Sequence, residues 1–438
     1  MLGWLTVTAS RSAPDRQPPD RAVEAVFRIE SPRIIARVAR LVGDVGLAEE
    51  LAQDALVAAL EQWPESGVPD NPGAWLTAVA KRRAVDLVRR HERYAVKLRE
   101  LGRDLETSPA IVPGPADTDP DAIDDDLLRL VFTACHPVLP ARARIALTLR
   151  LLGGLGTREI ARALLSSEPA VAQRIVRAKR TLAERSVAYE VPHGPDREAR
   201  LGSVLEVIYL IFNEGYAATA GDDLQRPALC EEALRLARVL AGLMPEESEV
   251  HGLAALLELQ QSRSAARTGP SGEPVLLADQ RRSRWNGLLV RRGFEALTRA
   301  ESRSSGAPGP YLLQAAIAAC HARAATYADT DWTRIAALYE LLAARAPSPV
   351  VELNRAVAVC HAYGPEPALA LVDALRAEPA LADYHLLPSV RGDLLLRLGR
   401  GAEARTEFTR AAALTRNEQE RQLLLTRAAG SGDPGVNE

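Results

Sequence analysis

Apolar residues recur at steps of three and four along almost the whole chain, and this helical periodicity limits the possible folds more than any other feature. Leu47, Leu51 and Ala55 illustrate the spacing, which places side chains on one face of an α-helix. Aromatic residues make up only 4% of the 438 residues, which disfavours a β-sandwich because strands are rich in aromatic and β-branched side chains. The sequence therefore predicts an all-α protein in which small side chains let helices approach closely.

Clusters of Pro, Gly, Ser and Asp interrupt this pattern and divide a chain that is too long for a single core. The stretch from Asp117 to Asp126 holds six aspartates and no basic residue. It is either a flexible acidic tether that stays off nucleic acid or a plain solvated linker. The predicted segments are a disordered N-terminus (1–20), a small helical domain (21–100), an acidic flexible linker (101–126), a second small helical domain (127–190) and a long helical extension (196–430).

The stretch 155–182 has the pattern of a helix-turn-helix. Thr157 is predicted to cap the first helix, Ser166-Ser167 to form the turn, and Pro169 to stand at the start of the second helix, where its missing N–H costs nothing. Val171, Ile175 and Ala178 are expected to face inward. The candidate DNA contacts of this second helix are Glu168, Ala170, Gln173, Arg174, Arg177, Lys179 and Arg180.

Gln and Arg are the side chains that form bidentate contacts to adenine and guanine edges in the major groove. Arg177, Lys179 and Arg180 are expected to lie nearer the phosphates, where they add affinity without sequence preference. The alternative is a basic surface on an ordinary helical hairpin. Because the whole chain carries a net charge of −3, any nucleic-acid interaction must depend on local clusters of this kind.

A second basic cluster runs from Lys81 to Arg99, with eight Lys or Arg residues against only Asp86 and Glu92. Such a run can neutralise several phosphates. Trp75 precedes it and either stacks on a base or packs in the core, and core packing is the favoured interpretation.

The late part of the chain has the layout of stacked helix pairs. Segment 390–415 resembles a tetratricopeptide helix pair, with Leu398-Gly399-Arg400 as its turn, and segment 350–375 gives a weaker echo. The two turns are separated by roughly the 34 residues expected for such repeats. Upstream of residue 330 the repeat cannot be traced.

Two stretches together resemble the extracytoplasmic-function sigma factors of RNA polymerase. Residues 47–94 resemble the second conserved region, through "LAEELAQDALVAALEQW" and "NPGAWLTAVAKRRAVDLVRRHERY", and residues 127–185 resemble the fourth, through "LTLRLLGGLGTREIARALL" and "AVAQRIVRAKRTL". The remainder is similar to the extension of a subgroup with tetratricopeptide-like C-terminal domains, in stretches such as "ADQRRSRWN" and "YLLQAAIAACHA". Ser166-Ser167 departs from the apolar pair expected in the turn, which puts the turn geometry or promoter preference in doubt.

The resemblance implies an alternative sigma factor that binds core RNA polymerase, recognises −10 and −35 promoter elements and initiates transcription. It implies contacts with the β′ clamp and the β flap of the polymerase. The residues that it assigns to the β′ clamp are Glu49, Glu50, Gln53 and Asp54. Those expected at the −10 element are Asn71, Lys81, Arg82, Arg83, Asp86, Arg89 and Arg90, of which Asn71 is a guess at the pocket for a flipped base. The extension is expected to control activity, either by docking on the DNA-reading domains or by binding a protein partner in a groove.

Other classes of function find less support. A conventional operator-binding regulator with a helical sensor and a helical-repeat scaffold with incidental basic patches remain as alternatives. No enzyme motif, cofactor or metal site is predicted, because the Cys-His pairs at 135–136, 320–321 and 360–361 consist of adjacent residues that diverge on a helix. Asn213-Glu214-Gly215-Tyr216 either lines a ligand pocket or ends a helix. Four widely spaced cysteines and the lack of a signal peptide or membrane span predict a cytoplasmic protein.

Overall fold

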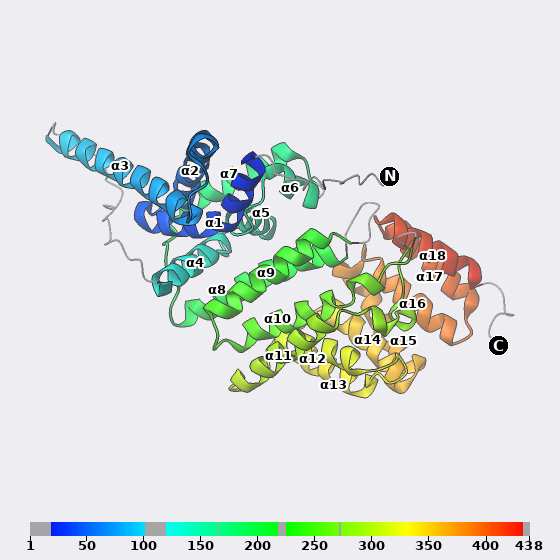
Figure 1. The fold of residues 1–438 in the computed structure, drawn as a ribbon. Coiled ribbons are helices and arrows are strands. Elements are labelled where there is room, and N and C mark those ends of the chain that lie inside the picture. Colours follow the sequence, from blue (N-terminus) through cyan, green and yellow to red (C-terminus); the bar gives the residue numbers. More distant parts are fainter. Residues whose placement is uncertain (1–18, 101–119, 165, 218–224, 271–272, 432–438) are drawn as a thin grey trace, which may run out of the picture. The chain divides into compact units, whose positions relative to one another are not determined.

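The computed structural model describes residues 19–100, 120–164, 166–217, 225–270 and 273–431, and it contains 18 α-helices and no strand within them (Figure 1). The prediction of an all-α protein is thus confirmed. The chain divides into two compact units, each assembled from segments that are separate in sequence. The predicted N-terminal disorder and most of the acidic linker lie outside the described residues.

The first unit is built from the chain up to Ala134 together with residues 149–155 and 179–191. It contains helices α1 (Pro19–Val42), α2 (Val45–Ser66), α3 (Pro72–Glu100) and α4 (Pro120–Ala134), and α1 packs against the other three. Ala36, Ala39 and Ala48 are fully buried, so helix axes can approach closely where these methyl groups meet. Between α1 and α2 the chain turns at Gly43, and the Asp44 side chain accepts a hydrogen bond of 2.9 Å from the Leu47 amide, which caps α2.

The helix-turn-helix stretch forms α6 (Thr157–Ala163) and α7 (Glu168–Glu184), after α5 (Ala141–Leu151). Thr157 is the first residue of α6 and not its cap, so that prediction is wrong. The cap is Gly156, whose amide donates to the Glu159 side chain at 2.7 Å. The Glu159 carboxylate, on the third residue of the helix, therefore accepts from the N-cap amide, as in a capping box.

The second unit contains residues 135–148, 156–178 and the chain from Pro192 onward. Its extension is a run of helices in which each packs on its neighbours along the chain. These helices are α8 (Pro195–Tyr216), α9 (Pro227–Leu243), α10 (Ser248–Gln261), α11 (Gly287–Arg303), α12 (Pro310–Arg323), α13 (Trp332–Arg345), α14 (Pro349–Tyr363), α15 (Pro365–Ala374), α16 (Leu386–Arg397), α17 (Gly401–Leu414) and α18 (Glu418–Gly430).

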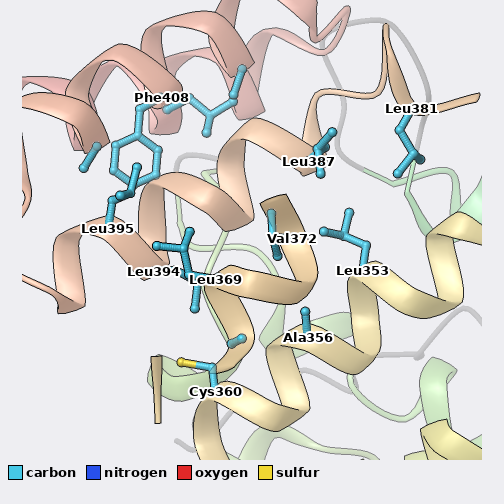
Figure 2. Packing of buried hydrophobic residues seen from close by; sticks show 14 of the residues in the cluster. Leu353, Ala356, Cys360, Leu369, Val372, Leu381, Leu387, Leu394, Leu395 and Phe408 are labelled. Atoms are coloured by element: carbon cyan, nitrogen blue, oxygen red, sulfur yellow. The ribbon is translucent and has the colours of Figure 1, made fainter. Parts of the chain in front are cut away.

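The predicted helix pair over 390–415 corresponds to α16 and α17, which pack together around Phe408 and Leu395 (Figure 2). A side chain at Gly392 would place its Cβ 2.8 Å from the Phe408 ring, so only glycine allows this approach. Gly399 takes a positive φ of 71° in the turn between the helices. The weaker echo over 350–375 corresponds to α14 and α15, which also pack together.

No helix in the described ranges is long and apolar enough to cross a membrane. Among the described residues there is also no group of three or more His, Cys, Asp or Glu placed to hold a metal ion. All four cysteines are buried thiols, and burial raises the pKa of each, to about 11 at Cys135 and about 12 at Cys230.

Candidate nucleic-acid interface

Helix α7 separates a buried face from an exposed one, as its sequence predicts. Val171, Ile175 and Ala178 are buried. The exposed candidates are Glu168, Gln173, Arg177 and Arg180, while Ala170 and Arg174 are half-buried. Arg180 forms a surface ion pair of 3.3 Å with Glu184. The helix therefore presents one amide and several guanidinium groups along a single solvent-facing strip.

Lys179 does not belong to this exposed strip. Its ammonium group forms an ion pair with Glu49 of α2, and its side chain keeps only 20% of its surface exposed. The Lys179 charge is paired with a carboxylate in this structure, and its phosphate contact stays a prediction.

Glu49, which the resemblance assigns to the β′ clamp, is only 4% exposed. Arg150 Nε donates to its carboxylate at 2.6 Å, and Gln53 Nε2 donates to the same oxygen at 2.9 Å. Lys179 pairs with the other oxygen. We call Glu49, Gln53, Arg150 and Lys179 the Glu49 cluster. It satisfies a buried carboxylate with two cations and one amide, which is the arrangement that a buried charge needs.

The remaining predicted positions on α2 face solvent. Glu50 and Asp54 are exposed, and Gln53 is half-buried. Asp54 pairs with Arg83 of α3 at 3.0 Å, with more than 40% of both side chains exposed. Such an exposed pair is weak and easily exchanged for another partner. Among the four predicted positions on α2, only Glu50 and Asp54 are therefore exposed.

Helix α3 carries the basic cluster at its surface. Arg82, Asp86, Arg89 and Arg90 are exposed, and Lys81 and Arg83 are half-buried. The side chains of Lys97 and Arg99 lie outside the described residues. Apart from the Arg83 pair, no ion pair given for the described residues engages these cations, so the surface stays strongly positive.

Asn71 caps α3, since its side chain accepts a 3.0 Å hydrogen bond from the Ala74 amide. Its structural role therefore accounts for an asparagine here without any base pocket. Trp75 is half-buried and packs edge-on against the buried Trp63 at 5.3 Å between ring centres. This favours the core-packing interpretation of Trp75.

A further contact of the first unit was not predicted from sequence. The Tyr189 hydroxyl lies 2.9 Å from the carbonyl oxygen of Ala36 and 3.0 Å from that of Asp126, so the two acceptors share its proton. Asp126 pairs with Arg40 at 3.4 Å and with Arg129 at 2.8 Å. Burial raises the pKa of Asp126 and of Tyr189. No local pattern reveals these partners, because Tyr189 is 153 residues from Ala36.

In the second unit, the segment before the helix-turn-helix is tied to the extension. Arg144 of α5 bonds to Ser203 and to Glu206 of α8, the latter at 2.9 Å. Ser203 in turn donates to the Cys135 carbonyl. Arg226 bonds to the Ala163 carbonyl at the end of α6 at 2.9 Å and pairs with Glu214. Residues 213–216 form the last turn of α8, which agrees with the helix-end interpretation.

Comparisons with known proteins place three family matches along the chain. Residues 26–94 match Sigma-70 region 2, residues 129–182 match Sigma-70, region 4, and residues 200–301 match a family of unknown function, DUF6596. An uncharacterized protein R00370 of Rhizobium meliloti is 45% identical over 89% of this chain and 91% of its own length. A probable ECF RNA polymerase sigma factor SigI of Mycobacterium tuberculosis is 27% identical over 39% of this chain and 57% of its own length. No solved structure matches the chain.

Proposed function

Because this chain belongs to the extracytoplasmic-function sigma factors and carries a C-terminal DUF6596 domain, we propose that it directs core RNA polymerase to promoters with −10 and −35 elements. The observation that carries the proposal is the exposed strip on α7, where Gln173 and Arg177 stand opposite a buried Val171–Ile175–Ala178 face. A helix of this kind enters a major groove with its outward side chains on base edges. Each bidentate base contact discriminates by about 1–3 kcal/mol.

Helix α3 reads the −10 element in this proposal. Arg82, Arg89 and Arg90 are exposed cations on one helix, and nothing described neutralises them. They supply phosphate contacts whose strength falls with added salt. Holding a flipped base costs a few kcal/mol of lost stacking, which such contacts offset.

The polymerase contact belongs to α2. Glu50 and Asp54 are available on its surface, and the weak Asp54–Arg83 pair can be exchanged for a cation of the β′ clamp. Glu49 is not available in this conformation because the Glu49 cluster occupies both of its oxygens. The second DNA-reading domain contacts the β flap, as in the family that the chain resembles.

Control by the extension is supported by its direct bonds to the helix-turn-helix stretch. Arg144 and the Ala163 carbonyl each bond to α8 or to the segment just before α9. A change in the extension would therefore act on the ends of α5 and α6. Stacked helices of this kind also offer a surface for a protein partner.

The deciding experiment is run-off transcription with purified core polymerase, the full chain and a promoter library. Start-site selectivity is expected only when both proteins are present. It should fall at least tenfold in Gln173→Ala, whereas Arg177→Ala should weaken promoter binding without changing base preference. Matched controls are Gln422→Ala on α18 and Arg299→Ala on α11, both exposed and far along the chain from α7. If core polymerase neither associates with the chain nor gains selectivity, the proposal is wrong. Tight promoter binding without polymerase would instead indicate a conventional regulator.

A further inference from the structure

Two arginines of the extension lie close to one tryptophan at the ends of two helices. Arg263 follows α10, and Arg282 precedes Trp285 in the connection to α11. The guanidinium carbon of Arg282 is 4.2 Å from the centre of the Trp285 ring, and that of Arg263 is 5.3 Å from it. His321 lies in the last turn of α12. We call Arg263, Arg282, Trp285 and His321 the arginine–histidine cluster.

No carboxylate among the described residues balances these two cations. Arg263 reaches only the amide oxygens of Gln260 and Gln280, at 3.4 Å each. The Arg282 side chain makes no hydrogen bond or ion pair within the described ranges, and Asp279 nearby is exposed and pairs with neither arginine. Burial and these two guanidinium groups lower the pKa of His321 to about 4. The cluster therefore combines two neighbouring positive charges with no internal counter-charge.

Several donors of the cluster are buried and lack an acceptor. They are Nη1 and Nη2 of Arg282 and Nε1 of Trp285, and the ring nitrogen Nδ1 of His321 is also without a partner. Buried polar groups are almost always hydrogen-bonded, so each exception needs an explanation. The two terminal nitrogens of an arginine form a fork that matches the two oxygens of a carboxylate or phosphate.

An aromatic wall fixes His321 in place. Its ring lies 5.2 Å from Trp332, which stacks on His361 at 4.1 Å, and the Tyr327 hydroxyl bonds to His361 at 3.0 Å. His361 is thus satisfied by Tyr327, whereas His321 Nδ1 stays open. These residues place aromatic rings, but no carboxylate, near the two arginines.

We propose that the arginine–histidine cluster binds a small-molecule oxyanion, a carboxylate or phosphate, on the terminal nitrogens of Arg282 with Arg263 as the second cation. Arg282 as a residue is half-buried while its two terminal nitrogens are buried, so binding requires this side chain to move. This would give the extension a ligand of its own. The proposal stands apart from the sigma-factor role, because its test requires neither DNA nor polymerase.

The test measures the melting temperature of the full chain in sodium phosphate and in sodium succinate, against sodium chloride at equal ionic strength. One of the two oxyanions is expected to raise the melting temperature, and Arg282→Gln should weaken its binding at least tenfold. Arg284→Gln, an exposed arginine two residues away, is the matched control and should bind as the native chain does. The anion that acts distinguishes phosphate ligands from carboxylate ligands.

A second readout follows His321 in the native chain and in the variant. A bound anion stabilises the charged imidazole, so the pKa of His321 in the native chain should rise on saturation, as followed by proton NMR. The charged and titratable neighbours are Arg263, Arg282 and His361. No shift with either anion, or an equal shift in Arg282→Gln, would overturn the proposal.

A different observation carries a second inference, which rests on the proposed function. The Glu49 cluster joins α2, the proposed polymerase helix, to the ends of α5 and α7 from the −35 domain. The Lys179 stem also lies against Gly46, where a Cβ would be 3.4 Å from Lys179 Cδ. We infer that the Glu49 cluster is an autoinhibitory contact, because α2 cannot present Glu49 to polymerase while α7 occupies it.

An engineered disulfide tests this directly. A Cβ at Gly46 would lie 3.7 Å from Lys179 Cβ, close to the roughly 3.8 Å found in disulfides. Gly46→Cys with Lys179→Cys should cross-link under mild oxidation, and run-off transcription should fall at least tenfold and recover on reduction. Lys179→Cys alone, treated with the same oxidant, is the control for oxidation and for the lost lysine.

The outcomes separate the two proposals. Failure to cross-link, or equal transcription by the oxidised and reduced double variant, would overturn the autoinhibitory contact. A native chain that never confers selectivity on core polymerase would instead overturn the sigma-factor role.

Discussion

Glu49 holds two cations from distant parts of the chain, and removing it leaves both without their carboxylate. Breaking a buried ion pair on one side costs about 3–5 kcal/mol, and the low end applies because Arg150 and Lys179 keep about a fifth of their side-chain surface exposed. Glu49→Ala should therefore lower the opening free energy of α2 amides by about 3 kcal/mol in hydrogen exchange. Glu50→Ala, which is exposed, should change it by less than about 0.5 kcal/mol.

His321 and His361 predict a pH dependence of the extension. Burial, with nearby arginines, lowers the pKa of both to about 4 from a model-peptide value of 6.5. Between these values the unfolded chain binds more protons, so this contribution to stability is full above pH 6.5 and is lost as the pH falls toward 4. The melting temperature should drop from pH 7 to pH 5, and by less in a His321→Gln, His361→Gln variant. His193→Gln, exposed, should keep the native drop; an equal drop in all three proteins would contradict the assignment.

At the residue scale, the sequence predicted correctly those side-chain positions that depend on a single helix. The inward and outward positions of α7 followed from spacing, because an isolated helix already fixes which side chains share a face. The burial of Glu49 was not predicted because its partner Arg150 is 101 residues away. Periodicity contains no information about which distant helix will cover a polar residue. For the same reason, the contacts of Tyr189 were not predicted.

At the scale of elements, variants of Asn71 can distinguish a role as helix cap from a role in a base pocket. Asn71→Ala removes the bond to the Ala74 amide and should cost α3 about 1 kcal/mol. Asn71→Ser restores a capping oxygen and should recover that stability. If Asn71→Ser also keeps native promoter melting, measured by permanganate reactivity of the −10 bases, the residue acts as a cap only. Loss of melting in a stable Asn71→Ser variant would assign it to the base pocket.

On helix α7, one residue is expected to contact phosphate and another to read the base sequence. With core polymerase present, Arg177→Gln is expected to reduce the slope of log affinity against log salt by about 1, because one phosphate contact is lost. Gln173→Ala should leave the slope unchanged and reduce discrimination at one base pair by about 1–3 kcal/mol. Affinities over a salt series for consensus and substituted −35 elements measure both. If the two variants change the slope alike, the assigned roles are wrong.

Among the elements, helices were predictable where breaks are marked by Gly or Pro. The pair α16–α17 and its Gly399 turn are read correctly from small residues and glycine. The predicted cap of α6 was off by one residue: Thr157 is already the first helical residue, and Glu159 closes the capping box on Gly156. The helices upstream of residue 330 lack a repeating turn, so their pairing could not be read from spacing.

At the scale of the whole molecule, the bonds from Arg144 to Ser203 and Glu206 make the extension part of the −35 domain's support. Removing the chain after residue 195 should leave Arg144, now buried, without these partners. Hydrogen exchange of α5 amides is expected to rise at least tenfold in the truncated chain. Removal of residues 432–438 alone is the control and should leave it unchanged. Equal protection in both would show that α5 does not need the extension.

The segments predicted along the sequence and the two compact units are different divisions of the same chain. Breaks in the sequence mark where helices end, whereas the units gather helices by packing, and residues 149–155 and 179–191 belong with α1 to α4. The order of segments along the chain does not reveal this packing, because no pattern in these short stretches indicates which helices they contact. The predicted domain boundaries along the sequence therefore stay a prediction.

The four buried cysteines make the folded chain slow to react with alkylating reagents, since the reactive thiolate is scarce when the pKa is raised. The rate at which each thiol is modified therefore reports how often the helices around that cysteine separate. Pulse labelling with an alkylating reagent, followed by mass spectrometry, would measure the opening rate at four native positions in one experiment, Cys135 beside α5 and the other three along the extension.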